Sequence, residues 1–258
     1  MFQRIFAGRS AWLFVTFFIW SVGTGSMQLA RPLFAAELGA SVFFVALVTA
    51  SNAFARLIAS PITGFLVDRF GRRPLVVAGT LLRGVSALGI FYAPSYEWFL
   101  TLEFIGGVGI SVFNTGSSVI IADMSGTENR GRAVAMRTTS LRLGTISGPF
   151  FGTLIAAVFD LRAIFMFNFI TKMMALVLIY IAIRETRPES ARRREAGARQ
   201  ALDLAPFRSK GFLAVMIATL AINMVGSGGA FSAVFPLQAK AAAGLDTTDI
   251  GNMITLSG

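Results

Sequence analysis

Long apolar runs separated by short polar gaps extend along nearly the whole sequence. They cover residues 11–33, 41–66, 75–93, 98–121, 139–159, 163–183 and 211–236, and an eighth begins near residue 247. Each run is close to the ~20 residues with which a helix crosses a hydrocarbon core. Strands of a membrane barrel are about half as long and alternate in polarity. The pattern therefore predicts an all-α membrane protein, and the first run is too long for a signal peptide.

The basic residues are concentrated in alternate gaps. One set holds Arg4 and Arg9 before the first run, then Arg69, Arg72, Arg73, Arg130, Arg132, Arg137 and the arginine-rich segment 184–210. The other set holds Arg31, Arg162 and Lys240. Positive charge gathers on the cytoplasmic side of membrane proteins. We therefore expect a multi-pass protein of the cytoplasmic membrane with its N-terminus in the cytoplasm. Topology also accounts for the net charge of +10, so no nucleic-acid partner is expected.

The composition limits the kinds of catalytic and metal-binding site that the chain can form. The chain has no cysteine and no histidine, which excludes disulfides and removes the commonest metal ligand and general base. The glycine clusters at 23–25 and 226–229 lack the Lys-Ser/Thr that follows a phosphate-binding loop. We therefore expect no enzyme, no metal site and no cofactor.

A dense charged segment, GFLVDRFGRRP, fills the gap at residues 64–74. So short a gap requires a tight turn, and Gly71 can adopt backbone conformations closed to other residues. Gly64 lets its helix approach a neighbour closely. Asp68 ends a helix, where the dipole disfavours a carboxylate, so it needs a cationic partner or the start of another helix.

This segment resembles the signature loop of the major facilitator superfamily, G-x-L-a-D-R-x-G-R-R/K. The matching residues are Gly64, Leu66, Asp68, Arg69, Gly71, Arg72 and Arg73, and Val67 replaces the usual small residue. The resemblance implies a six-helix bundle over 1–183, a basic cytoplasmic linker over 184–210, and the beginning of a second bundle over 211–258. The chain is then expected to be truncated, with the remaining C-terminal bundle as its missing partner.

The resemblance also implies a role for the loop. The family's aspartate latches the two halves together on the cytoplasmic side, and we expect the same of Asp68. The segment ADMSGTENRGRA, residues 122–133, resembles the loop between spans four and five, so Asp123 and Arg130 can join the charges around Asp68. The competing interpretation is that the arginines only set topology.

Span four carries LEFIGGVG at 102–109, with Glu103 where the family often has an arginine. That arginine is associated with proton coupling in drug antiporters, and Glu103 can itself carry a proton. Glu103, Gly107, Asn114 and Ser118 share one helix face. We expect this face to line a cavity, and polar contacts between helices are the alternative.

Span five contains LGTISGPFFGT at 143–153. Gly144, Gly148 and Gly152 form a flat face for close packing, and Pro149 favours a bend. The segment resembles part of the antiporter motif of family efflux pumps, although Thr153 replaces the last glycine. Ordinary small-residue packing explains it equally well.

Charges inside membrane spans tend to be functional. Arg56 and Arg142 are candidates for the transport pathway. Arg83 and Lys172 fall on spans that are peripheral in the family, so we expect them to be structural, pairing with carbonyl groups or reaching the membrane surface. Cationic side chains suit an anionic substrate and Glu103 suits a cation, and the sequence leaves both open.

Spans one, four and seven line the central cavity of this family. The resemblance therefore implies substrate contacts from one face of span one and from span seven. These residues are Ser21, Thr24, Gln28, Asn223 and Ser227.

The predicted function is secondary transport of a small solute by alternating access, driven by a proton or another coupling ion. The partial motif in span five and the apolar, Phe-rich helices favour efflux of drug-like compounds. Uptake of a polar or anionic solute by symport is the alternative. A non-transporting receptor or scaffold on the same fold is the alternative from another class.

Overall fold

The computed structural model describes residues 9–125 and 129–182, together with residues 209, 211, 214, 217 and 218. Residues 9–125 and 129–182 form six helices, each with a segment long and apolar enough to cross a membrane. The helices are α2 (Arg9–Glu37), α3 (Val42–Phe70), α4 (Arg72–Phe91), α5 (Tyr96–Met124), α6 (Arg130–Val158) and α7 (Leu161–Ala182). The prediction of an all-helical membrane protein is confirmed for this part of the chain.

The six helices match the first six predicted spans, with one clear difference in length. The fifth span was expected from residue 139, but α6 begins at Arg130. Polar residues can continue a helix beyond the hydrocarbon region, because the helix supplies its own backbone hydrogen bonds there as well. Only residue 209 of the linker 184–210 and residues 211, 214, 217 and 218 of the predicted seventh span are described. The predicted eighth span, Asn223 and Ser227 lie outside the described residues.

A single residue, Gly71, separates α3 from α4. Its backbone has φ 96° and ψ 165°, a conformation that is essentially restricted to glycine. Its N–H still donates to the Val67 carbonyl at 3.1 Å, so the turn closes against the last turn of α3. The expectation that Gly71 permits a tight turn in the signature segment is confirmed.

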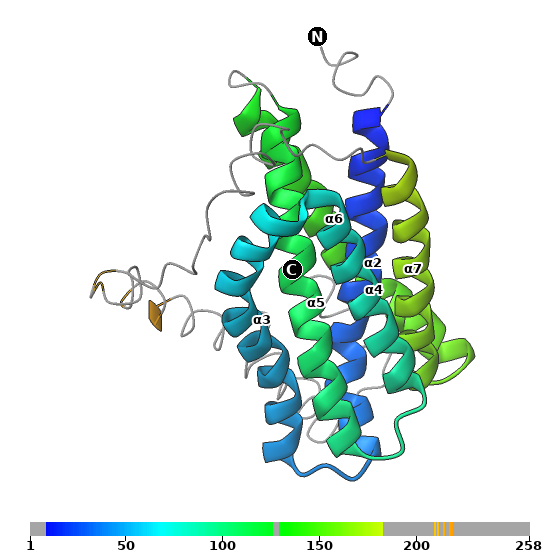
Figure 1. Ribbon diagram of the computed structural model, residues 1–258. Helices are drawn as coiled ribbons and strands as arrows, with labels where there is room; N and C mark the ends of the chain where they lie inside the picture. The colour runs from blue at the N-terminus through cyan, green and yellow to red at the C-terminus, as the bar shows by residue number, and fades with distance from the viewer. Residues whose placement is uncertain are drawn as a thin grey trace.

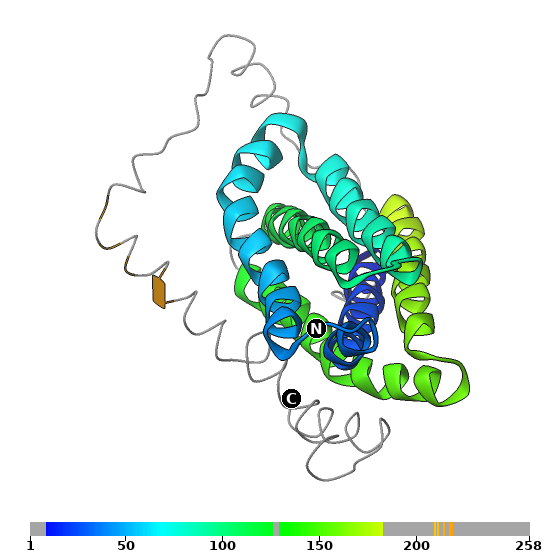
Figure 2. The same cartoon turned by 90° about the horizontal axis from the view of Figure 1, so that it is seen from below.

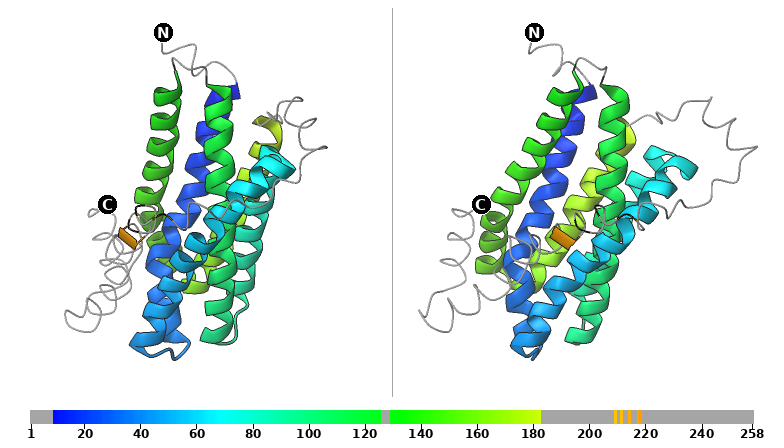
Figure 3. Two further views of the ribbon diagram at one scale, coloured as in Figure 1. Left: turned by 60° about the vertical axis from the view of Figure 1, so that its left-hand side comes forward. Right: turned by 90° about the vertical axis from the view of Figure 1, so that its left-hand side faces the viewer.

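The helices run alongside one another, with consecutive ones joined at alternating ends (Figure 1). Seen end-on, α2 lies between α6 and α7, while α5 lies between α3 and α4 (Figure 2). Helix α3 runs at an incline to its neighbours (Figure 3) and packs mainly against α5. One end of the bundle holds the start of α2, the α3–α4 turn, the end of α5 and the start of α6 (Figure 1).

Aromatic side chains fill the interior near the other end of the bundle. The rings of Phe34, Phe99 and Phe165 lie 5.0 to 5.6 Å apart in tilted and edge-on arrangements. Deeper in the bundle, Trp20 stacks on Phe113 with ring centroids 4.0 Å apart. These contacts join α2, α5 and α7 through geometries that aromatic rings prefer.

The exposed side chains along the middle of α4 and α7 form an apolar surface. On α4 they include Leu81 and Val85, and on α7 Ile170, Met174 and Val177. In water such a surface would be unfavourable, whereas hydrocarbon is a suitable solvent for it. This side of the bundle is suited to contact with lipid.

Candidate functional site

Glu103 is fully buried in α5 and lies at the centre of a polar network that joins four helices. Its Oε2 is 3.1 Å from Arg31 Nε on α2, and its Oε1 is 3.4 Å from Arg83 Nη1 on α4. From α3, Asn52 Nδ2 donates to Glu103 Oε2 at 2.9 Å and to the Glu103 carbonyl at 3.2 Å. The two guanidinium groups and the amide compensate the charge of a carboxylate that has no access to water.

Arg83 is also fully buried, and its guanidinium occupies space that a glycine leaves open. A Cβ at Gly106 would collide with Arg83 Nη1 and would lie 2.6 Å from Ser86 Oγ. Arg83 Nη2 also approaches the Met27 sulfur atom. The sequence suggested that Arg83 pairs with carbonyl groups or reaches the membrane surface. That expectation is wrong, because the guanidinium turns inward and its partner is a carboxylate.

Lys172 on α7 is a second fully buried cation, and it has no carboxylate partner among the described residues. Its Nζ donates to the Trp20 carbonyl at 2.5 Å and to Thr24 Oγ1 at 3.0 Å. The ammonium group also lies 4.3 Å from the centroid of the Trp20 ring, a favourable cation–π arrangement. The expected carbonyl contact of Lys172 is therefore observed.

Arg137 connects α6 to α5, whereas we expected it only to contribute to the topology. Its Nε donates to Ser117 Oγ at 3.2 Å, while its Nη2 donates to Ser117 Oγ at 2.7 Å and to Asn114 Oδ1 at 3.3 Å. The guanidinium also lies 5.6 Å from the Phe17 ring. The sequence signal was the polar face of α5, on which Asn114 and Ser117 lie three residues apart.

The glycine face of α6 packs directly against α2. A Cβ at Gly148 would lie 2.5 Å from the carbonyl carbon of Gly25, and one at Gly144 would lie 2.5 Å from the Phe18 carbonyl oxygen. Gly152, Pro149 and Thr153 are buried on the same side. Ser21 donates across this interface to the Leu141 carbonyl and lies 2.7 Å from Thr145 Oγ1. The predicted close packing of this face is therefore observed, and Ser21 takes part in it.

The end of the bundle near the α3–α4 turn carries an ion pair between α4 and α5. Arg72 Nε lies 3.2 Å from Asp123 Oδ2. Arg73 Nη2 donates to the Tyr180 carbonyl at 3.0 Å, which connects the turn to α7. Arg130 is exposed at the start of α6. These contacts bring two of the predicted latch residues, Arg72 and Asp123, together.

Asp68 and Gly64 also belong to the predicted latch loop. Asp68 lies in the last turn of α3, as expected, but its side chain is outside the described part of the structure. Outside its own helical turn, no described atom lies within 4 Å of the position that a Cβ at Gly64 would take. The close helix approach expected at Gly64 is therefore not found among the described helices.

The sequence matches the family model of the Major Facilitator Superfamily over residues 12–258. The chain belongs to this superfamily. It is 28% identical over 187 residues to the multi-drug resistance efflux pump PmrA of Streptococcus pneumoniae, covering 71% of this chain and 44% of the pump. It is 27% identical over 245 residues to multidrug resistance protein 1 of Bacillus subtilis, covering 94% of this chain and 61% of that protein.

The fold of this superfamily is also found among solved structures. A D-xylose–proton symporter superposes with a TM-score of 0.72 at 18% identity, covering 96% of this chain and 65% of the symporter. The chain thus spans about half of the length of the curated relatives named above. Membership of this transporter family confirms the expectation that the chain is not an enzyme.

Five of the residues predicted to line the cavity or the pathway are accessible at the surface of the described bundle. Gln28, Arg56 and Asn114 are half-buried, whereas Ser118 and Arg142 are exposed. Arg142 makes no hydrogen bond or ion pair with a described residue.

The other predicted pathway residues of the described bundle are engaged in contacts in its interior. Glu103 is enclosed by its ion pairs, Ser21 lies in the α2–α6 interface, and Thr24 accepts the hydrogen bond of Lys172. Glu103 and Ser118, which the sequence placed on one helix face, therefore differ in surroundings. Their roles in transport stay a prediction.

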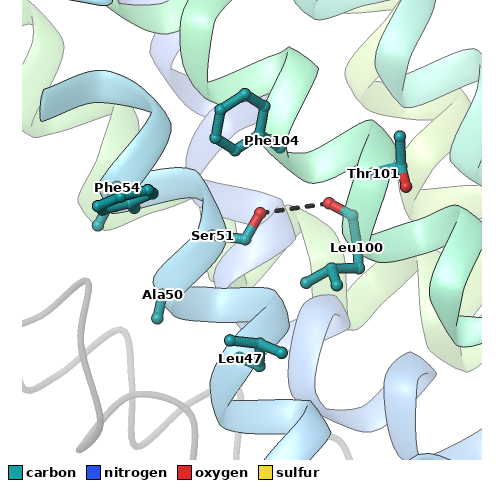
Figure 4. A pocket seen from close by; sticks show the side chains of 8 residues that line it. Leu47, Ala50, Ser51, Phe54, Leu100, Thr101 and Phe104 are labelled. Carbon is teal, nitrogen blue, oxygen red and sulfur yellow. Dashed lines mark hydrogen bonds between the residues drawn. The ribbon is translucent and has the colours of Figure 1, made fainter. Parts of the chain in front are cut away.

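An apolar groove of about 590 Å³ lies between α3 and α5. Its lining residues are Leu47, Ala50, Ser51, Ala53 and Phe54 of α3 and Leu100, Thr101 and Phe104 of α5 (Figure 4). The Ser51 hydroxyl donates to the Leu100 carbonyl at 3.2 Å and so is used within the wall. The groove can accept an apolar group, and the sequence did not predict it.

Proposed function

We propose that the full-length protein is a secondary transporter of the cytoplasmic membrane that exports amphipathic, drug-like compounds by alternating access. The observation on which this rests is that polar residues within the membrane spans, among them Gln28, Asn114 and Arg142, remain accessible. An exposed arginine and half-buried amides in an otherwise apolar structure are costly against lipid, but are suited to a water-filled pathway. Two of the relatives that the chain resembles carry names of multidrug proteins, which favours export of apolar or amphipathic molecules.

The pathway requires a second bundle that faces these accessible polar residues. We propose that residues 1–183 form the first bundle, that 184–210 are a cytoplasmic linker, and that 211–258 begin the second. Secondary transporters of this type bind their substrate between two such repeats near the midplane. In this arrangement Gln28, Asn114 and Arg142 are the contacts contributed by the first bundle, with Asn223 and Ser227 as contributions from the second.

The orientation follows from the arginines. The end of the bundle that carries Arg69, Arg72, Arg73 and Arg130 is the cytoplasmic end, as the positive-inside rule requires. The N-terminus is then also cytoplasmic. Asp68 lies at the same end, one turn before the ion pair of Arg72 with Asp123, and holds the two bundles closed there in one state of the cycle.

Export against a gradient needs an energy source, and we propose proton entry. Glu103 is the proposed proton carrier, because it is the carboxylate in the interior of the described helices. Its exchange with solvent requires a conformational change that separates it from Arg31 or Arg83. Such a change couples proton binding to bundle movement.

A flux assay tests this proposal. Purified full-length protein is reconstituted into proteoliposomes, which are loaded with a lipophilic fluorescent compound such as ethidium. Flux of the compound is then measured with and without an imposed pH gradient. We expect gradient-dependent flux that Glu103→Gln abolishes and that Asp68→Asn slows, while Glu97→Gln at the exposed start of α5 has no effect. Flux that persists in Glu103→Gln with unchanged pH dependence would remove Glu103 from the mechanism.

Uptake of an anionic solute by symport is the second candidate, and the excess of arginine over carboxylate inside the bundle favours it. The same vesicles distinguish the two functions, because a symporter accumulates its solute in the direction of proton flow. A receptor or scaffold would give no flux of either compound, with or without the pH gradient.

A further inference from the structure

Positive charge exceeds negative charge around Glu103. Each of the cations Arg31, Arg56, Arg83 and Lys172 lies close enough to at least two of the others to repel them electrostatically. Every acidic residue of the described helices other than Glu103 lies within two residues of a helix end. Arg31 and Arg83 share Glu103, and Lys172 is held by a carbonyl, a hydroxyl and an indole ring. Arg56 is therefore the cation without a partner among the described residues.

Arg56 lies on the side of α3 that faces this network. Asn52, one turn earlier on the same face of the helix, donates to Glu103 Oε2 at 2.9 Å. Glu103 attracts Arg56, and Arg31 repels it. The Arg56 Nε is buried and makes no hydrogen bond, and its guanidinium forms no hydrogen bond or ion pair with any described residue. An unpaired guanidinium inside a membrane span is costly and tends to be functional.

Two members of the network are closed off from solvent in the described structure, and two are accessible. The side chains of Arg83 and Glu103 are fully buried, whereas that of Arg31 is 13% exposed and Arg56 is half-buried. Gln28, three residues before Arg31 on the same face of α2, is also half-buried. A solute can therefore reach Arg31 and Arg56 while the buried pair stays intact.

We propose that Arg31 and Arg56 bind the carboxylate, sulfonate or phosphate group of an organic anion. The planar fork of donors of a guanidinium matches the oxygen atoms of these groups. Arg56 then gains a counter-charge, and Arg31 is shared between the solute and Glu103. This inference rests on the proposed transport function and narrows its substrate class to organic anions, the class of the second candidate above.

Glu103 opposes the binding of such an anion, because it already holds Arg31 and its own charge repels a second carboxylate. Glu103→Gln should therefore tighten binding of an anion, although the same substitution removes a counter-charge from the fold. A general loss of structure would weaken binding instead. The sign of this effect thus distinguishes a ligand site from a set of purely structural cations.

The depth of Arg56 favours a free solute over a lipid head group as the source of the anion. Arg56 is the middle residue of the 29-residue helix α3, Val42–Phe70. Lipid head groups lie at the surfaces of the membrane, outside the ~30 Å hydrocarbon core that such a helix crosses. An anion bound at the middle of α3 therefore has to enter through the protein.

A matched pair of fluorescent probes tests the proposal. Full-length protein in phosphatidylcholine nanodiscs is titrated with dansylglycine and with the uncharged dansylglycinamide, which has a carboxamide in place of the carboxylate. The wild-type protein should bind the acid at least about tenfold more tightly than the amide. Arg56→Gln and Arg31→Gln should each raise the Kd of the acid at least about tenfold, whereas Glu103→Gln should lower it at least about threefold. Arg162→Gln, which removes an arginine of α7 that contacts the Phe91 carbonyl, should leave it within about twofold.

The midpoint of thermal unfolding is the folding control. Arg56→Gln should keep or raise this midpoint, because it removes a cation without a partner. Saturating dansylglycine should raise the midpoint of the wild-type protein but not that of Arg56→Gln. A lower midpoint for Arg56→Gln would show that the rest of the protein supplies a counter-charge for Arg56, and would overturn the inference.

Three binding results would also overturn it. They are equal Kd values of the acid and the amide for the wild-type protein, a full preference for the acid in Arg56→Gln, and weaker binding of the acid in Glu103→Gln. Displacement of the acid when phosphatidylglycerol replaces part of the phosphatidylcholine would assign the site to a lipid head group, and so would overturn the assignment to a solute.

Proteoliposome flux separates this inference from the proposed function. If dansylglycine binds through Arg31 and Arg56 but no compound is transported, the site stands and the transporter proposal fails. If ethidium is exported but dansylglycine does not bind, transport stands and the anion site fails.

Discussion

Arg83 and Glu103 face one another across the α4–α5 interface, both fully buried, with Nη1 of the arginine 3.4 Å from Oε1 of the glutamate. Gly106 provides the space for this guanidinium. Three features of the interface, a cation, an anion and a residue without a side chain, thus depend on one another. A complete buried ion pair of this kind adds little to the stability of the folded protein. The removal of one partner, however, leaves a buried charge without compensation and is strongly destabilising.

Glu103→Gln should therefore destabilise the protein by about 3–5 kcal/mol, because Arg31 and Arg83 both lose their counter-charge. The midpoint of thermal or denaturant unfolding of the purified full-length protein measures this. Glu97→Gln is the control, since Glu97 is exposed at the start of α5 and its replacement should matter by less than about 0.5 kcal/mol. Equal midpoints for the two variants would contradict the structural role of the network.

Gly148→Ala should lower the free energy of unfolding by about 1–3 kcal/mol, because the new Cβ would lie 2.5 Å from the Gly25 carbonyl carbon and force α2 and α6 apart. Gly131→Ala is the matched control. Outside its own helical turn, no atom of the described residues lies within 4 Å of the added methyl group, and alanine favours a helix over glycine by about 0.5–1 kcal/mol. The two substitutions should thus shift the unfolding midpoint in opposite directions.

Gly71→Ala should cost about 1–3 kcal/mol, because the φ of 96° and ψ of 165° at this turn are strained for any residue with a Cβ. Gly64→Ala, in open space within α3, should not destabilise the described bundle. The same unfolding assay compares them. If Gly64→Ala retains stability but loses flux, the remainder of the protein contacts α3 at this position.

Arg137→Gln should destabilise the protein by about 1–3 kcal/mol, since the shorter side chain cannot reach both Ser117 and Asn114. Arg142→Gln removes an equal charge from an exposed side chain of the same helix, and should change stability by less than about 0.5 kcal/mol. A similar loss in both variants would show that charge, rather than the contacts to α5, is responsible.

The orientation can be measured with single cysteines, because the chain itself contains none. Glu97→Cys and Asn129→Cys place a thiol at exposed positions near the opposite ends of α5. A membrane-impermeant maleimide should label position 97 in intact cells and position 129 only in inverted vesicles. The reverse pattern would place the N-terminus outside the cell.

The apolar periodicity was sufficient to predict the six helices, because lipid requires long and uniformly apolar segments. The conformation of Gly71 was also predictable, since a tight turn with glycine has few alternatives. The start of α6 at Arg130 was missed, because hydropathy marks the hydrocarbon boundary rather than the end of the helix.

The charge network was largely beyond prediction. Arg31 was counted among the basic residues of a gap, and Arg83 was assigned to the periphery, yet both turn towards Glu103. Pairing between helices depends on their rotation and vertical offset, which the hydrophobic pattern leaves free. The repeated glycines of α6 were the exception, because only a close neighbour explains a face without side chains.

The contact between Gly25 and Gly148 has a consequence for how the bundle can move. Their backbones meet without intervening side chains, so a slide of α2 along α6 by one residue would bring a bulkier neighbour into the gap and raise a steric barrier. We expect spin labels at the exposed residues Val15 and Leu143 to report the same separation in every conformational state. The α2–α6 pair then moves as one rigid unit with a fixed register. Conformational change therefore has to occur at the contacts of this pair with other helices.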